Sequence, residues 1–374
     1  MKTHFQFATL IFAASLAAVA QNSDTHLYRS GNEWIQEIHG AMPAAKMLKV
    51  RSSAGAIRVE GAQQNNITYT IREHVRAGSE EAARREIARL KFSTASGEVA
   101  WLRAECEGSN HGYIDFQIQA PAQTAVLKLE TEGGAVTAKN VSGKVEANTG
   151  GGGIELDQVG GAISVTSGGG DIYIGKAGAD VMAETGGGNV RIDSAAGKIG
   201  AKSGGGNLRI GSGKLMTLET GGGWITVTKC LGWIKASTGG GNIELNEILG
   251  TAQIGTGGGS IKVGPISGGL RAETGSGPII ATLARGNATF VDSRLETSVG
   301  DITVLIPHDL PISVRANVEV ARREGIRSDF SEIPVTRSGE IGPREAYAEG
   351  KLNGGGPLLH IHTATGTIVI KRAP

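Results

Sequence analysis

Residues 167–184 read SGGGDIYIGKAGADVMAE, and residues 185–202 read TGGGNVRIDSAAGKIGAK. The two stretches share one pattern: a Ser or Thr, three glycines, a polar residue, an apolar-x-apolar triplet and, later, a second such triplet. The pattern occurs eight times between residues 131 and 274, at steps of 18 residues except for one step of 17. A repeat of this length predicts a solenoid, in which similar units of chain stack on one another.

Aligned on the Ser or Thr, the repeats form columns of small aliphatic side chains. In the repeat that begins at Thr185, Val190 and Ile192 belong to the first triplet, and Ile199 and Ala201 belong to the second. Polar or mixed residues separate the members of each pair, so each triplet is a strand with one buried and one exposed face. We therefore predict an all-β, single-chain β-solenoid, or β-helix, built from 18-residue, two-strand rungs.

The glycine runs predict a sharp corner in each rung. A glycine in a fixed conformation costs roughly 0.5–1 kcal/mol relative to alanine, so the repeated glycines need a cause. Two explanations remain open: the corner requires a positive φ, or successive rungs stack so closely that no Cβ fits. The residue after each run is usually of a type that suits turns and forms side-chain ladders along a stack. These residues are Asp171, Asn189, Asn207, Trp224, Asn242 and Ser260.

The flanking segments repeat the same phase less regularly, so we expect them to cap the two ends of the stack. One helix is expected over 79–92, with Ser79 as its N-cap and Ala83, Ile87 and Leu90 on one face. The expected organisation is a signal peptide (1–20), an N-terminal segment (21–45), an N-terminal cap region with a degenerate rung, strands and the helix (46–130), a regular β-solenoid (131–307), and C-terminal cap strands with a final rung (308–374).

The first 20 residues predict export. Lys2 is followed by a mostly apolar stretch over 5–19, and Ala18, Val19 and Ala20 form an A-x-A cleavage site. No later segment approaches the ~18 apolar residues of a membrane-spanning helix, so we expect no transmembrane segment in the mature chain. We expect an exported protein in the periplasm, at the cell surface or outside the cell.

The composition argues against several classes of function. Without Lys2 the chain has 36 acidic and 36 basic residues, so it lacks the basic surplus of a nucleic-acid-binding surface. A phosphate-binding glycine loop precedes a helix, whereas a strand follows the glycines here, so we expect no nucleotide and no other cofactor. Two cysteines make no disulfide framework, and Cys230 falls in a weak inward-facing column as a small buried side chain.

Two features resemble metal sites, but each has a simpler explanation. Asp171 beside a glycine run is similar to the calcium-binding β-roll repeat, but that repeat needs an Asp at nearly every half-turn and this column holds mostly Asn, Trp or Ser. His360 and His362 share one face of a strand at a spacing that suits chelation, and an exposed strand face explains them equally well. We predict no metal site.

The candidate ligand contacts are exceptions in the repeat or members of its outer face. Trp224 and Trp233 break the pattern, and exported binding surfaces often use flat aromatic side chains to meet sugars or partner proteins. They lie half a rung apart, so we expect them at opposite corners, and one of them is alternatively a local cover over the shortened rung. Tyr173, Arg191 and Arg209 lie on the outer face of the first strand.

Catalysis has weaker support. Asp180, Glu184, Glu219 and Glu273 would supply paired carboxylates for glycoside cleavage, but in so regular an array we expect them to be separate outer-face charges. Parallel β-helix enzymes usually grow long loops to house a site, and residues 131–281 carry none. We therefore predict no catalytic residue and a non-enzymatic protein.

The C-terminal segment 354–361 reads GGGPLLHI and runs into Thr365, Gly366, Thr367 and Ile368. Together with the rung pattern and the signal peptide, it resembles the bacterial family called putative adhesin, over most of 46–372. The resemblance implies an exported β-solenoid domain of undetermined biochemical role, without a motif-defined active site.

Three functions from different classes follow from these observations. The leading hypothesis is a rigid repetitive surface for adhesion or cell-envelope assembly, with an envelope glycan or a surface protein as its partner. The alternative is a polysaccharide-acting β-helix hydrolase or lyase that uses outer-face carboxylates or the corner at 282–293. A further alternative is self-assembly into a filament or scaffold through exposed end rungs.

Overall fold

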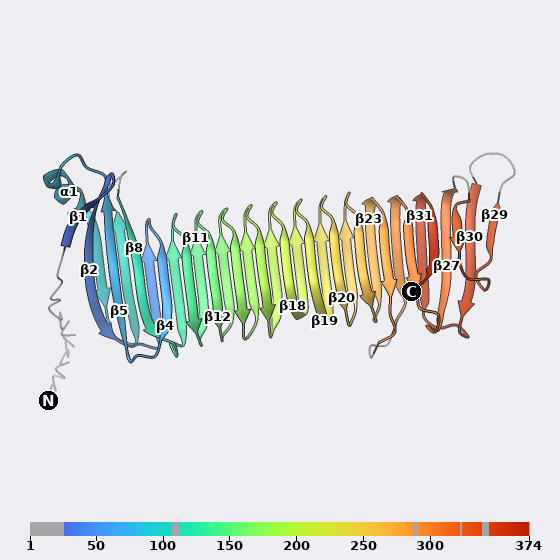
Figure 1. Ribbon diagram of the computed structural model, residues 1–374, viewed down its shortest axis with the longest axis horizontal. Coiled ribbons are helices and arrows are strands. Elements are labelled where there is room, and N and C mark those ends of the chain that lie inside the picture. The colour runs from blue at the N-terminus through green and yellow to red at the C-terminus, as the bar shows by residue number, and fades with distance from the viewer. Residues whose placement is uncertain (1–25, 107–111, 287–289, 322–323, 339–343, 374) are drawn as a thin grey trace, which may run out of the picture.

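The computed structural model describes residues 26–106, 112–286, 290–321, 324–338 and 344–373. Figure 1 shows an elongated rod whose strands run across its long axis, with one helix, α1 (Glu80–Ile87), near the N-terminal end. The prediction of an all-β, β-helix-like fold with one helix is confirmed. The predicted signal peptide (1–20) lies outside the described residues.

The strands form two walls, joined along the rod by the long strands β18 and β19. Wall 1 contains, in order along the rod, β1 (His26–Ser30), β2 (Glu33–Pro43), β5 (Asn66–Val75), β8 (Gly112–Pro121), β4 (Ile57–Ala62), β10 (Val136–Val141), β12 (Ile154–Val159), β14 (Ile172–Ala177), β16 (Val190–Ala195), the first halves of β18 (Leu208–Thr220) and β19 (Ile225–Thr238), β20 (Ile243–Ile248), β22 (Ile261–Ile266), β24 (Ile279–Leu283), β26 (Ile302–Ile306), β32 (Ile368–Arg372) and β28 (Ile326–Ser328).

Wall 2 begins with strands of the N-terminal region and ends with strands of the C-terminal region. It contains, in order, β6 (Leu90–Ala95), β7 (Val99–Cys106), β3 (Met47–Ser52), β9 (Val126–Thr131), β11 (Lys144–Thr149), β13 (Ile163–Ser167), β15 (Val181–Thr185), β17 (Lys198–Ser203), the second halves of β18 and β19, β21 (Ala252–Thr256), β23 (Leu270–Ser276), β25 (Ser293–Val299), β31 (Leu358–Thr365), β27 (Ile312–Ala321), β30 (Arg344–Leu352) and β29 (Val335–Ser338).

The middle of each wall is a parallel ladder in which like residues of successive repeats pair. Ile154 pairs with Ile172, and Ile172 with Val190, so ladder partners here lie 18 residues apart. The step from Ile210 to Val227 is 17 residues, and the register between β18 and β19 shifts beside Lys214. The shortened repeat therefore loses its residue at the corner opposite the glycine runs, and both strands keep their pairing.

The inward-facing columns are buried and form one continuous hydrophobic cluster along the rod. Aliphatic side chains dominate it, which suits a rod that is only two walls thick. Cys230 is fully buried in this cluster, as predicted, and Cys106 and Cys230 are both free thiols. Burial raises the pKa of the Cys230 thiol, which keeps it protonated and unreactive.

A Ser or Thr hydroxyl links each repeat to the one before it. Thr238 donates from Oγ1 to the carbonyl oxygen of Gly223 in the preceding repeat (2.9 Å) and accepts from the N–H of Gly241 in its own glycine run (3.2 Å). The same pair of bonds is made by Thr131, Thr149, Ser167, Thr185, Ser203, Thr220 and Thr256. These hydroxyls belong to buried residues, and both bonds of Thr238 are themselves buried, so each satisfies a backbone group that is shielded from water.

The glycines are explained by close stacking of the corners. A Cβ on Gly204 or Gly206 would overlap the carbonyl oxygen of Gly186 or Gly188 in the preceding repeat, whereas a Cβ on Gly205 would meet open space. No glycine between 133 and 259 has a positive φ. Of the two explanations that the sequence left open, close stacking holds for the first and third glycine of each run in this range.

The residue after each glycine run forms the predicted ladder along the rod. Asp171 Oδ1 accepts from the N–H of Asn189 (2.7 Å), Asn189 Oδ1 from that of Asn207 (2.9 Å), and Asn207 Oδ1 from that of Trp224 (2.8 Å). The carboxylate of Asp171 is thus a backbone acceptor between repeats. The amides of Asn189 and Asn207 fill the same structural role, so this role does not need a negative charge.

The N-terminal end is closed by antiparallel strands and α1. Strands β1, β2, β5 and β8 continue wall 1 in antiparallel order, and α1 packs against β2 and β5. Ser79 caps α1 by accepting from the N–H of Ala82, as predicted, and Ala83 and Ile87 are buried. The predicted extent of 79–92 is too long, because Leu90 and Phe92 belong to β6, which pairs with β7 and covers the edge of wall 2.

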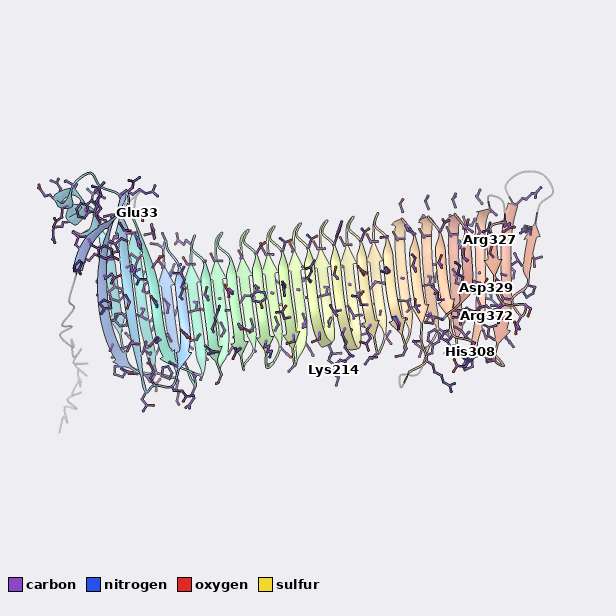
Figure 2. The ribbon with its side chains drawn as sticks, in the orientation of Figure 1. Glu33, Lys214, His308, Arg327, Asp329 and Arg372 are labelled. Carbon is purple, nitrogen blue, oxygen red and sulfur yellow. The ribbon has the colours of Figure 1, made fainter. Side chains whose placement is uncertain are left out.

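The C-terminal end is closed by strands that are out of sequence order. The last strands, β31 and β32, lie directly on β25 and β26, and the earlier segment β27–β30 lies beyond them. Residues 308–357 therefore hold more than the single strand expected: β30 pairs antiparallel with both β27 and β29. Figure 2 shows Asp329 and Arg372 close together at this end, where the N–H of Arg372 donates to Asp329 Oδ2 (3.3 Å).

We expect Thr238→Val to lower the free energy of unfolding by about 1–3 kcal/mol, because it keeps the side-chain volume but leaves two buried backbone groups unpaired. The matched control is Thr228→Val on the exposed face of the same strand, which should change stability by less than about 0.5 kcal/mol. Urea unfolding followed by circular dichroism measures both. Equal stability of the two variants would mean that the hydroxyl bridge contributes nothing.

A second pair of variants separates stacking from chain flexibility. Gly206→Ala should destabilise the protein by about 1–3 kcal/mol, because its Cβ meets backbone atoms that cannot move without parting two repeats. Gly205→Ala should be neutral or stabilising by up to about 1 kcal/mol, because a methyl group at position 205 meets open space. Thermal unfolding midpoints of the two variants test the order, and the reverse order would refute it.

Candidate functional site

The outer face of wall 1 brings together three of the residues that the sequence singles out. Tyr173 on β14, Arg191 on β16 and Arg209 on β18 are ladder partners in successive strands. Asp193 Oδ2 accepts from the hydroxyl of Tyr173 (2.8 Å) and Asp193 Oδ1 from Nε of Arg191 (2.9 Å). The Arg191 guanidinium lies 5.5 Å from the centre of the Tyr173 ring, so these side chains support one another.

The electrostatics of this group follow from those contacts. Burial disfavours the charged form of Asp193, but the hydrogen bonds from Tyr173 and Arg191 outweigh it and lower the pKa of Asp193. The bond to Asp193 and partial desolvation raise the pKa of Tyr173. Tyr173 therefore stays protonated and Asp193 ionised at neutral pH, which makes this a fixed polar surface and not a proton-transfer pair.

Trp224 lies at the edge of the same outer face. It follows the glycine run, its side chain is 61% exposed, and its N–H bonds to Asn207, which lies two residues before Arg209. Trp224 thus borders the Tyr173–Arg209 group on the glycine-corner side. Flat exposed aromatic rings beside guanidinium groups are common in surfaces that bind sugars and proteins.

Trp233 lies on the other side of the rod from Trp224. It begins the second half of β19, is 38% exposed, and pairs with Leu215 beside the shortened corner. Leu231 and Leu249, at the same corner, are also exposed. Trp233 therefore lies among exposed apolar side chains at the shortened corner, and the structure does not bring the two tryptophans together.

The four carboxylates considered for catalysis do not form one site. Asp180 accepts from the N–H of Lys198 (2.8 Å) at the corner opposite the glycine runs. Glu184 and Glu219 lie two strands apart on wall 2, with Lys202 between them and 3.6 Å from Glu219. Glu273 lies three strands farther along and bonds to Arg271. Asp180, Glu219 and Glu273 thus each have a structural partner.

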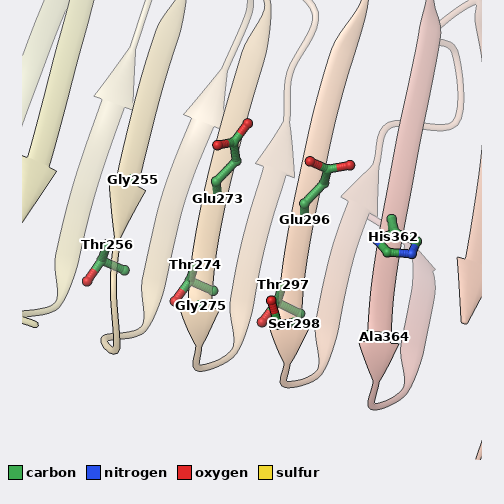
Figure 3. A pocket seen from close by; sticks show the side chains of 10 residues that line it. All are labelled: Gly255, Thr256, Glu273, Thr274, Gly275, Glu296, Thr297, Ser298, His362 and Ala364. Carbon is green, nitrogen blue, oxygen red and sulfur yellow. The ribbon is translucent and has the colours of Figure 1, made fainter. Parts of the chain in front are cut away.

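A hollow of about 540 Å³ opens on the outer face of wall 2 near the C-terminal end (Figure 3). Glu273 on β23, Glu296 on β25 and His362 on β31 are ladder partners along it. His362 Nε2 lies 3.0 Å from Glu319 Oε1, and the ring of His360 stacks 6.5 Å away. Among the described residues, no group of three or more His, Cys, Asp or Glu side chains is arranged to hold a metal ion.

A second hollow, of about 360 Å³, adjoins it and is lined by three arginines and a histidine. These residues are Arg271, Arg294, Arg315 and His360; only His360 was singled out from the sequence, as one of a pair of histidines with His362. The alignment of the repeats could have placed Arg271, Arg294 and His360 in one outward-facing column. Each of them directly precedes an inward-facing residue of a second strand, namely Ala272, Leu295 and Ile361. No repeat signal places Arg315, because β27 lies outside the repeats.

The N-terminal end holds a compact cluster that sequence analysis also missed. His74 Nδ1 lies 3.3 Å from Glu33 Oε2, its ring stacks on Tyr113 (4.4 Å), and the Tyr113 hydroxyl donates to Glu33 (3.0 Å). His74 Nε2 is buried without a hydrogen bond within the described residues and lies 3.8 Å from Asp115 Oδ2. Figure 2 places Glu33 at this end of the rod. The four residues come from three strands, β2, β5 and β8, so no local sequence motif identifies them.

Glu73, next to His74 in β5, is the carboxyl at this end whose pKa is shifted most. Its side chain is 3% exposed, and Glu73 Oε2 accepts a hydrogen bond from Gln36 Nε2 (3.1 Å). Burial raises its pKa from 4.5 to about 7, and the bond from Gln36 offsets part of that rise. The carboxyl is therefore largely protonated below neutral pH in the folded protein.

A pH-dependent stability follows from Glu73. Because its pKa is higher in the folded than in the unfolded chain, the folded chain binds more protons between these values, and the free energy of unfolding falls as pH rises from about 4.5 to about 7. The contribution lost is on the order of 3 kcal/mol. Urea unfolding at several pH values should show this slope shrinking in Glu73→Gln but not in the exposed control Glu60→Gln. An unchanged slope in Glu73→Gln would exclude this residue as the cause.

Comparison with known proteins gives structural neighbours only. No family model and no curated protein matches the chain. Three solved structures are similar to it: a "putative cell adhesion protein" from Clostridium sporogenes (7% identity, 90% of this chain and 99% of that chain, TM-score 0.17), a "putative adhesin" from Parabacteroides distasonis (12%, 73% and 96%, 0.31) and a "putative adhesin" from Bacteroides fragilis (12%, 72% and 97%, 0.24).

Two of these neighbours carry the same name, putative adhesin, as the family that the sequence resembles. In the described part of the chain, no helix is long and apolar enough to cross a membrane.

Proposed function

We propose that the protein is a non-enzymatic, exported rod that presents a rigid repetitive surface for adhesion or cell-envelope assembly. One observation carries the proposal: the hollows lie open on the outer walls and extend across several consecutive strands. The hollow at Thr166, Glu184, Lys202 and Glu219 (about 520 Å³) crosses four strands of wall 2. The hollow at Glu273 crosses β21, β23, β25 and β31.

Hollows of this shape suit an extended partner. A small-molecule site usually encloses most of its ligand, whereas a shallow track across equally spaced strands offers the same contact repeatedly. A polymer or another cell surface gains affinity from such repetition, because many weak contacts act together once the first has formed. The surface formed by Tyr173, Arg191, Arg209 and Trp224 supplies aromatic and cationic contacts of the kind such a partner uses.

The enzymatic alternative has one observation in its favour. Glu184 and Glu219 lie in the same open hollow, about two strand spacings apart, which is roughly 9–10 Å. Inverting glycosidases place their carboxyl groups at roughly 6.5–9.5 Å, with room between them for substrate and water. Here Lys202 occupies the intervening ladder position and pairs with Glu219. This arrangement favours binding over cleavage.

The filament alternative would need ends that repeat the pairing pattern of the rod. Three of the four wall edges carry antiparallel strands instead: β1 and β6 at the N-terminal end, and β29 at the C-terminal end. The fourth edge, β28, is a parallel strand of only three residues. Short antiparallel edges of this kind discourage end-to-end pairing. We therefore favour lateral contacts through the walls.

The proposal is tested with the full mature chain, immobilised and exposed to a panel of envelope glycans, matrix proteins and whole cells. We expect saturable binding to at least one of them, reduced about ten-fold or more in Trp224→Ala with Arg209→Gln, and unchanged in the exposed control Glu60→Gln. Reducing-end release on the same glycans should stay at background. Binding to nothing on the panel, or release of reducing ends, would count against the proposal.

A further inference from the structure

We propose that the outer face of wall 2 near the C-terminal end binds a linear polysaccharide that carries carboxylate groups. The contact surface is a line of four side chains that we call the arginine row: Arg271, Arg294, His360 and Arg315. This inference rests on the proposed function, because it assigns a ligand class to part of the adhesive surface.

The arginine row is formed by residues that are far apart in the sequence. Arg271 on β23 pairs with Arg294 on β25, Arg294 with His360 on β31, and His360 with Arg315 on β27. Adjacent strands lie about 4.8 Å apart, so the row presents one cationic or imidazole group at each such step. The arginines are exposed and His360 is half-buried between two of them.

The row is not a by-product of the repeat. The same outer column in the regular array holds Met182, Gly200, Thr217, Lys235 and Gln253. The column has a cationic pair, Lys49 and Lys128, at its N-terminal end, and a run of three arginines and a histidine where the final strands join the array and its cap. The hollow of about 360 Å³ lies over this junction, with Asp292 and Leu358 at its edge.

Neighbouring glutamates hold each guanidinium in place. Arg271 Nε bonds to Glu273 (2.7 Å), Arg294 Nη2 to Glu296 (2.5 Å) and Arg315 Nη2 to Glu349 (3.0 Å). A guanidinium has five N–H donors in a rigid fork, so donors remain on each group for a ligand carboxylate. Ordering by the glutamates reduces the entropy that binding would otherwise lose.

The adjacent column decides which anion fits. Glu273, Glu296 and His362 run parallel to the arginine row, two residues nearer the glycine corner, and line the hollow of Figure 3. Carboxylates accept hydrogen bonds from sugar hydroxyls, but they repel a densely sulfated chain. A row of cations beside a row of acceptors therefore matches a polyuronate, which carries one carboxylate and several hydroxyls on each sugar.

Dimensions and protonation agree with this ligand class. One pyranose unit is about as long as the spacing between strands, so successive sugars lying along the rod meet successive side chains of the row. Burial and the nearby positive charge of Arg294 lower the pKa of His360. His360 is therefore neutral at neutral pH and contributes a hydrogen bond and a flat ring, while the arginines supply the charge.

The first test changes the ligand and keeps the protein intact. Calorimetric titration of the full mature chain with polygalacturonate should show binding at least about ten-fold tighter than with the methyl ester of the same polymer, and weaker binding at high salt. Dextran sulfate should bind no better than polygalacturonate. Equal binding of acid and ester, or a clear preference for the sulfated polymer, would overturn the proposal.

The second test places the site. Arg294→Gln with Arg315→Gln should weaken binding of polygalacturonate by about ten-fold or more, whereas Arg58→Gln, an exposed arginine on wall 1, should leave it unchanged. Circular dichroism checks that both variants are folded, and the acid–ester comparison decides the matter if the double variant is not. Unchanged binding in a folded double variant would refute this site.

The two proposals fail differently. A protein that adheres to cells or neutral glycans but does not prefer carboxylated polymers would retire the arginine row and leave the adhesive function standing. A protein that binds no surface and no glycan would retire both.

Discussion

The structure depends on the close approach of consecutive glycine corners and on the hydroxyl that joins them. Thr238 shows the arrangement: one Oγ1 accepts from its own glycine run and donates to the carbonyl of the run before it. The carbonyl is within reach only because Gly239 and Gly241 carry no Cβ, which would overlap backbone atoms of the preceding corner. Glycine and hydroxyl are therefore two parts of one constraint: the first permits contact, and the second converts it into a bond.

This constraint determines the register of both walls and the alignment of their outer side chains. A corner that repeats without slippage holds both walls in register, so each outward position becomes a straight column along the rod. The Asp171, Asn189 and Asn207 side chains add a second line of bonds beside the first. At the opposite corner such bonds occur only at some steps, as between Asp180 and the N–H of Lys198, and this corner tolerates change, as the lost residue beside Lys214 shows. Variation in the outer columns costs little, so surface chemistry can change while the scaffold stays constant.

The repeat explains why much of the fold was predictable from the sequence and why the candidate surfaces were less so. Inward columns, corners and the position of the shortened repeat follow from spacing, because each residue contacts its counterparts in the neighbouring repeats. The helix was overextended because Leu90 and Phe92 continue an apolar pattern that fits a helix or a strand equally well, and pairing with β7 decides for the strand. The cluster of Glu33, His74 and Tyr113 depends on antiparallel pairing across β2, β5 and β8, for which no period exists.

The most informative departure from sequence order is at the C-terminal end. The chain leaves the array after β26, forms the cap strands, and returns to place β31 and β32 between array and cap. A simple repeat can place only repeat-derived residues in an outer column, whereas this return inserts His360 and His362 beside Arg294 and Glu296 and brings Arg315 to their far side. The junction therefore combines the fixed strand spacing of the array with side chains that the array does not supply. A charged polymer that lies along the rod would therefore meet regularly spaced arginines at this junction. Their positions depend on β31 pairing with both β25 and the cap strand β27.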